Sequence, residues 1–127
     1  MTKISIFLFV ALFAFVTVAE VMIGSGVRSF SRAAQAQFPG KRVEALIAMV
    51  DCESCDMRDR NHAVWALGQL DDPRALAVLE KYHTGEECDH VHRLCQKTLG
   101  IALRHLRHED NNRGEAFLWR WMLPDES

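Results

Sequence analysis

The chain has 127 residues, a formal net charge of −2 and a hydrophobic content of 49%. A charge this close to neutral excludes a broad electrostatic attraction to nucleic acid, so we expect no nucleic-acid partner. The length suits one small domain. The first forty residues differ in composition from the rest, which leaves about 85 residues to form a modest core.

Residues 4–23 are almost wholly apolar and indicate a membrane segment. Twenty residues of α-helix span about 30 Å, which is the thickness of a bilayer's hydrocarbon core. Glu20 is the one charge in this run, close enough to its end to reach the lipid headgroups. Lys3 precedes the run, as in a signal sequence or signal anchor. We expect residues 1–23 to be an uncleaved membrane anchor, with a signal peptide cleaved after Ala19 or Ala36 as the alternative.

The orientation of this anchor follows from two opposing signals. The span is followed by more basic residues than precede it, and the positive-inside rule would then place the rest of the chain in the cytoplasm. The cysteines and the signal-like start favour export instead. We expect the carboxyl-terminal domain on the exported side, periplasmic or extracellular.

Residues 24–40 have the composition of a linker, with small and polar residues and a turn signal at Pro39 and Gly40. Within it, residues 29–37 suit a short helical stalk. The folded domain is expected over residues 41–123.

That domain has the pattern of an all-α fold, because no segment alternates with period two over a convincing length. The first helix carries an apolar stripe at Val43, Leu46, Ile47 and Val50. Asp56 is placed to cap a second helix that runs to Leu70.

Three further helices are expected. Asp72 caps the third, and Pro73 suits its first position. The fourth is expected to begin near Asp89, and a fifth near Asn112, where Asn112 and Glu115 have capping-box spacing. The fourth has an apolar side made of Val91, Leu94, Cys95, Thr98, Leu99, Ala102 and Leu106.

An internal repeat with a spacing of 32 residues relates the two halves of this domain. Arg42 falls on Arg74, and Leu46 falls on Val78. Over residues 41–106 the chain resembles HEAT-like repeat proteins, of the short bacterial kind first noted in phycobilin lyases. The most specific part is residues 63–75, which match the pattern Ala-x-x-Ala-Leu-Gly-x-Leu-x-Asp-Pro-Arg-Ala. The resemblance implies a short α-solenoid of about two helical hairpins, closed by a carboxyl-terminal capping helix and preceded by a single transmembrane helix.

Cys52, Cys55, Cys88 and Cys95 are the cysteines of the chain. The repeat places them at one edge of the domain, where an exported protein with a thin core would use them in disulfides. The pairing stays open, since four cysteines allow three pairings. The alternative is a structural zinc site made of the same four cysteines, because Cys52-x-x-Cys55 has metal-ligand spacing and His90 and His92 lie near Cys88.

Catalysis has little support in the sequence. A covalent haem site needs a histidine directly after Cys-x-x-Cys, and here Asp56 follows Cys55. A thioredoxin-like Cys-x-x-Cys motif needs an α/β fold around it, which this sequence does not predict. We therefore expect a non-enzymatic protein without a cofactor. The phycobilin lyases that share the repeat are enzymes, so the resemblance leaves an accessory lyase or a chaperone for a cofactor-bearing protein as the alternative.

A membrane-anchored adaptor that binds another protein is the function that we expect. Helix phase places six polar candidates for contact with that partner on the outer surface: Arg58, His62, Gln69, Arg93, Lys97 and Arg104. Trp119 and Trp121 belong to an aromatic segment that we expect to cap the last repeat, or else to be exposed for a partner or the bilayer interface.

Overall fold

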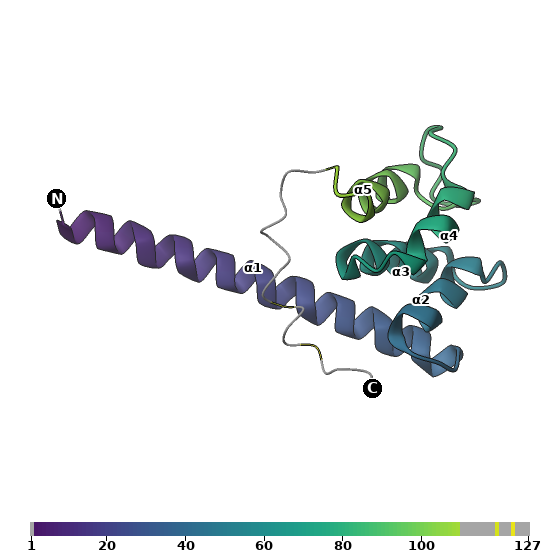
Figure 1. The fold of residues 1–127 in the computed structure, drawn as a ribbon, viewed down its shortest axis with the longest axis horizontal. Coiled ribbons are helices and arrows are strands. Elements are labelled where there is room, and N and C mark those ends of the chain that lie inside the picture. The colour runs from purple at the N-terminus through teal and green to yellow at the C-terminus, as the bar shows by residue number, and fades with distance from the viewer. Residues whose placement is uncertain (1, 110–118, 120–122, 124–127) are drawn as a thin grey trace.

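The computed structural model describes residues 2–109, 119 and 123, and within them it contains helices and no strands. These are α1 (Thr2–Gln37), α2 (Arg42–Asp51), α3 (Met57–Leu70), α4 (Arg74–Tyr82) and α5 (Gln96–Leu106). The prediction of an all-α chain is thus confirmed for this part. The capping helix expected from Asn112 lies outside the described residues, and so does Trp121. The first half of α1 projects away from the other helices, which gather around its second half (Figure 1).

The first half of α1 is long and apolar enough to cross a membrane. Its most apolar window of 18 residues has a mean hydropathy of 2.7, and 6% of that window is buried. Large apolar side chains from Ile4 to Met22 are exposed. This surface has the length and composition of the membrane segment expected from the sequence.

The second half of α1 belongs to the folded domain, which differs from the linker expected over residues 24–40. The helix continues without a break to Gln37 and buries Val27, Ser31 and Ala34. A Cβ atom added at Gly26 would lie 3.3 Å from the ring of Trp65, so this glycine allows the ring to pack close to the helix. The predicted turn follows at Gly40, whose φ of +128° favours glycine.

Glu20 and Trp119 meet on the side of α1. Glu20 was expected to reach the headgroups, but its residue is only 6% exposed, and Trp119 donates its backbone N–H to the Glu20 carboxylate over 3.4 Å. Trp119 is fully buried, and its Cβ lies 3.1 Å from the position of a Cβ added at Gly24. Trp119 is therefore not an exposed contact residue.

The predicted cap of α3 is present, while α4 begins one residue later than expected, at Arg74, so that Pro73 rather than Asp72 is the residue before the helix. The Asp56 carboxylate accepts the backbone N–H of Arg58 over 2.8 Å, and α3 ends at Leu70, as expected, before Asp71 turns to a φ of 54°. The Asp72 carboxylate accepts the backbone N–H of Arg74 over 2.9 Å. Local capping chemistry thus fixes where both helices begin.

α3 is the central helix of the domain. It packs against α1, α2 and α5, while α4 packs mainly against α5 and α2. The buried Arg60 donates from Nε to the carbonyl of Val50 over 3.0 Å and so joins α3 to the last turn of α2. α3 and α5 approach each other closely at Gly68, where an added Cβ would lie 2.8 Å from Cα and Cβ of Ala102.

The prediction that the fourth helix begins near Asp89 is wrong, because α5 begins at Gln96. Asp89 does accept the backbone N–H groups of Val91 and His92, over 3.0 and 3.3 Å, but this bonding supports one turn only. The chain then extends so that the backbone N–H of Cys95 donates to Oδ1 of Asn61 over 2.8 Å. Val91, expected on the buried side of a helix, is 73% exposed.

Candidate thiol cluster and adjoining groove

The loop between α4 and α5 is held in place by a buried glutamine. Oε1 of Gln96 accepts the backbone N–H groups of Thr84 and Gly85, over 2.8 and 3.3 Å. Its Nε2 donates to the carbonyls of Tyr82 and Leu94, over 3.1 and 3.2 Å. One buried side chain therefore ties the beginning of the loop to its end, and the bond from Cys95 to Asn61 fixes it to α3.

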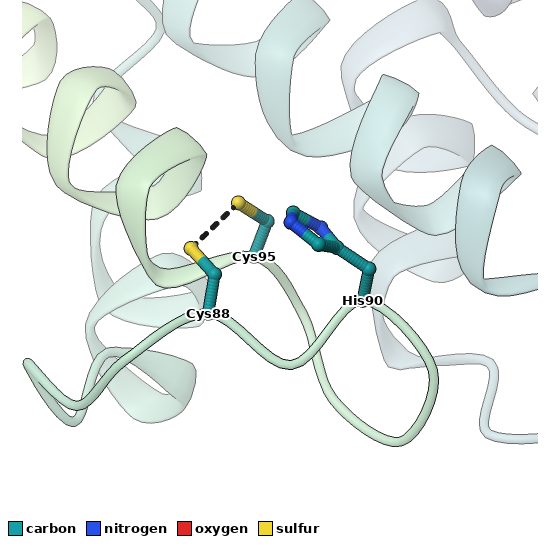
Figure 2. A group of neighbouring side chains, drawn as sticks. All are labelled: Cys88, His90 and Cys95. Atoms are coloured by element: carbon teal, nitrogen blue, oxygen red, sulfur yellow. Dashed lines mark hydrogen bonds between the residues drawn. The ribbon is translucent and has the colours of Figure 1, made fainter.

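This loop brings three metal-binding side chains together, which we name the thiol cluster: Cys88, His90 and Cys95. Their ligand atoms all lie within 4.8 Å of one another, and the two sulfur atoms lie 3.0 Å apart without a bond between them. Figure 2 shows the Cys88 and Cys95 side chains pointing toward each other, with the His90 ring turned toward Cys95. The sequence offered all three side chains as possible ligands, and the structure brings them together without His92.

The start of α5 surrounds both sulfur atoms with hydrogen-bond donors. The backbone N–H of Lys97 donates to Sγ of Cys88 over 3.3 Å. Burial raises the pKa of the Cys95 thiol, but hydrogen bonds from Cys88 and from Thr98 outweigh this effect. The pKa of Cys95 is thereby lowered to about 7. A thiol at a helix amino terminus commonly has a lowered pKa, because the helix stabilises the thiolate.

We predict that the reduced, metal-free protein gains thiolate as the pH rises through about 7, because Cys95 loses its proton there. The measurement is thiolate absorbance in the ultraviolet as a function of pH. Cys95→Ser should remove this step, and Thr98→Val should move it to higher pH, because valine keeps the side chain's shape without the donor hydroxyl. A first thiolate step near the usual cysteine pKa of about 8.5 would contradict the prediction.

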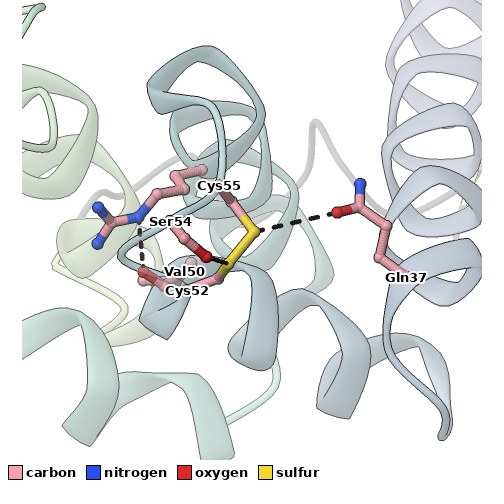
Figure 3. The surroundings of a disulfide bond; sticks show 6 residues. Gln37, Val50, Cys52, Ser54 and Cys55 are labelled. Atoms are coloured by element: carbon pink, nitrogen blue, oxygen red, sulfur yellow. Dashed lines mark hydrogen bonds between the residues drawn. A yellow bond between two sulfur atoms is a disulfide. The ribbon is translucent and has the colours of Figure 1, made fainter.

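Cys52 and Cys55 are joined by a disulfide between α2 and α3, with 5.4 Å between their Cα atoms. Figure 3 shows this bond beside Gln37, whose side-chain oxygen lies 4.0 Å from Sγ of Cys55. The prediction of a disulfide is confirmed for this pair, whereas Cys88 and Cys95, which were candidates for a disulfide too, are free thiols in the structure. The four-cysteine zinc site is not formed, because these two sulfur atoms are bonded to each other and His90 is the third side chain beside Cys88 and Cys95.

A groove of about 810 Å³ runs along the beginning of α3 and is named here the α3 groove. Its two sides come from α3 and from the α4–α5 loop, so the position of the loop shapes it. Two of the expected contact residues, Arg58 and His62, line it, and the ring of His62 also stacks on Phe30 with 4.1 Å between ring centroids. The full lining is Asp56, Met57, Arg58, Asp59, Asn61, His62, His90 and Val91.

The other expected contact residues do not line the α3 groove. Arg93 forms an ion pair with Glu86 within the loop. Lys97 and Arg104 are exposed on α5, and Gln69 is half-buried near the end of α3. The structure therefore separates Arg58 and His62 from the rest of the set.

Comparison of the chain with protein-family models, with curated proteins and with solved structures finds no match.

Sequence reasoning missed Asn61 and Val91 as parts of this region. Asn61 carries no local signal, because its role depends on a backbone group 34 positions away. Val91 was assigned to an apolar helix face by periodicity, and only the true start of α5 reveals that it is exposed.

Proposed function

We propose that the chain is a non-catalytic, membrane-anchored adaptor that binds another protein in the α3 groove. The observation that carries the proposal is the exposure of Val91, 73% of whose surface is accessible at the groove. It is the one exposed large hydrophobic side chain among the described residues outside α1. Together with Met57, Val91 gives apolar contact area to a groove whose other lining residues are polar, and protein interfaces combine the two in this way.

The lining of the groove favours a polypeptide as its occupant. Met57 and Val91 offer apolar contacts, while Arg58 and Asp59 offer charges of both signs. Protein interfaces combine apolar and polar area in this way. A nucleic acid would need a surplus of basic groups, which this lining does not have. We therefore infer a partner that inserts a segment with both apolar and polar side chains.

The structure of α1 supports the membrane anchor. Its apolar first half is exposed, and its second half contributes Val27 and Ala34 to the buried interior. Because one helix serves both parts, the groove would be held at a fixed distance from the bilayer, without a flexible tether. Cleavage after Ala36 would remove these core residues, which favours an uncleaved chain over that alternative.

The Cys52–Cys55 disulfide supports an exported position for the domain, because disulfides persist in oxidising compartments. The alternative in which the domain faces the cytoplasm would expose this bond to cellular reductants.

We also propose that α2 to α5 form two stacked HEAT-like hairpins. In support, α2 and α4 begin 32 residues apart, at Arg42 and Arg74. The helix after α2 is α3 and the helix after α4 is α5, and these two second helices pack against each other. The repeats differ after this point, since α5 begins later in its repeat than α3 does.

Site-specific photo-cross-linking in intact cells tests the adaptor function. A photoreactive phenylalanine analogue at position 91 should give a discrete adduct with another protein, because this side chain lies at the groove. The same analogue at Glu87, an exposed residue of the same loop outside the groove lining, is the matched control and should give little adduct. Arg58→Ala should weaken the adduct from position 91.

Two outcomes would contradict the proposal. Equal adducts from positions 87 and 91 would show that the groove has no special role. Turnover of a thiol or tetrapyrrole substrate by the purified protein would favour the accessory lyase over the adaptor.

A further inference from the structure

We propose that the thiol cluster is a zinc site in which Cys88, His90 and Cys95 supply three ligands and the fourth position is open. Two thiolates and an imidazole form a donor set that suits Zn²⁺. The site extends beyond the proposed adaptor function and does not depend on the identity of the partner.

The positions of the donor atoms suit a single ion. Zinc binds sulfur at about 2.3 Å and imidazole nitrogen at about 2.0–2.1 Å, so two thiolates on one tetrahedral ion lie about 3.8 Å apart. The two sulfur atoms lie 3.0 Å apart, and all three donor atoms are within 4.8 Å of one another. The two sulfur atoms would have to move apart by less than about 1 Å to bind the ion, and a change in a side-chain torsion can provide this movement.

Hydrogen bonds from the surrounding structure hold the three ligands in place. The backbone N–H of Lys97 already donates to Sγ of Cys88, and the bond from Cys95 to Asn61 fixes the backbone beside the second sulfur. Asp89 caps the turn that begins at His90. Hydrogen bonds of this kind orient ligands before the metal arrives.

If the domain is exported, as the proposed function holds, two thiols at this distance would form a disulfide unless a metal held them. Zinc would hold them as thiolates, because it binds sulfur and undergoes no redox change itself. Three protein ligands and one open position leave a place for water or for a donor from another molecule.

Metal titration of the full chain in detergent tests the site, with Co²⁺ as the spectroscopic probe and Zn²⁺ as the competitor. We expect the reduced, metal-free protein to bind one equivalent of Co²⁺, with a thiolate-to-cobalt charge-transfer band and the intense visible bands of tetrahedral cobalt. Zn²⁺ should displace it. Cys95→Ser should abolish the charge-transfer signature of the two-thiolate site.

Two histidines give a matched pair of variants. His90→Ala should weaken zinc binding about tenfold or more, since even loss of a supporting group costs a metal site this much. His92→Ala, two positions further on the same exposed turn, should bind like the parent. The double variant Cys52→Ser/Cys55→Ser should also retain the site.

Four results would overturn the proposal. These are the absence of a tetrahedral cobalt spectrum, equal binding by His90→Ala and His92→Ala, binding of Cu⁺ without binding of Zn²⁺, and a Cys88–Cys95 disulfide in protein isolated without reductant. Because His90 and His92 are exposed, their replacement tests the site without disturbing the core.

Discussion

Gly68→Ala is expected to lower the free energy of unfolding by about 1–3 kcal/mol, which is the usual cost of forcing an extra group into a packed interior. The new Cβ would lie 2.8 Å from both Cα and Cβ of Ala102. A backbone atom cannot move aside as a flexible side chain does, so α3 and α5 must separate. α3 also packs against α1 and α2, which means that the displacement affects the whole domain.

Gly100→Ala is the matched control, because Gly100 also lies inside a helix. Its added Cβ would meet only Nε2 of His83, at an ordinary contact distance of 3.7 Å. Alanine should therefore raise the free energy of unfolding by about 0.5–1 kcal/mol through its better helix propensity. Denaturation of the full chain in detergent, followed by far-ultraviolet circular dichroism, measures both values. Effects of the same sign at the two positions would contradict the packing described for α3 and α5.

The second large effect is expected in the apolar first half of α1. The double variant Phe9→Arg/Phe13→Arg should fail to remain in the membrane, because each arginine near the centre of a spanning helix costs about 2.5–3.5 kcal/mol. Both phenylalanines are exposed, at 74% and 70%, and so would face lipid. Alkaline carbonate extraction of cell membranes is the measurement.

Phe9→Leu/Phe13→Leu is the control for this experiment, since it changes the same side chains and keeps them apolar. This variant should remain in the membrane pellet with the parent chain. Release of the parent chain itself by carbonate would contradict membrane integration, and retention of the double arginine variant would show that another part of the protein holds it.

The helix positions that depend on local chemistry were predictable from the sequence. Asp56 and Asp72 accept the backbone bonds that their places before apolar runs imply, and α3 ends at Leu70 as expected. Leu46 and Val50, two members of the predicted stripe of the first helix, are fully buried. Caps and periodic apolar positions act over a few residues, so they can be read without knowledge of the fold.

The course of α1 beyond its apolar first half was not predictable in this way. Gly24 and Gly26 suggested a tether, but each admits a tryptophan that lies far along the chain, Trp119 and Trp65. The same residue type serves flexible linkers and close helix packing, and only the packing partner distinguishes them. The late start of α5, at Gln96, could not be predicted for a similar reason, since Asn61 of α3 holds the backbone of Cys95 in an extended conformation.

Only the residue types of the candidate site could be predicted from the sequence, because which of them lie together depends on the fold. Cysteine and histidine spacing identified Cys88, His90 and Cys95 as possible ligands, but it also offered Cys52 and Cys55. The two pairs belong to different loops, and the sequence contains no measure of their separation. In the structure, Cys52 and Cys55 form a disulfide with each other, and His90 lies beside the other two cysteines.

In the proposed arrangement, a retained membrane helix continues directly into the domain that presents the α3 groove. The intact mass of the chain purified from membranes shows whether residues 2–23 remain attached. We predict a mass that includes them, because the exposed apolar part of α1 is long enough to cross a bilayer and continues without a break into the part that packs in the core. A mature chain that begins after Ala19 or Ala36 would contradict this account.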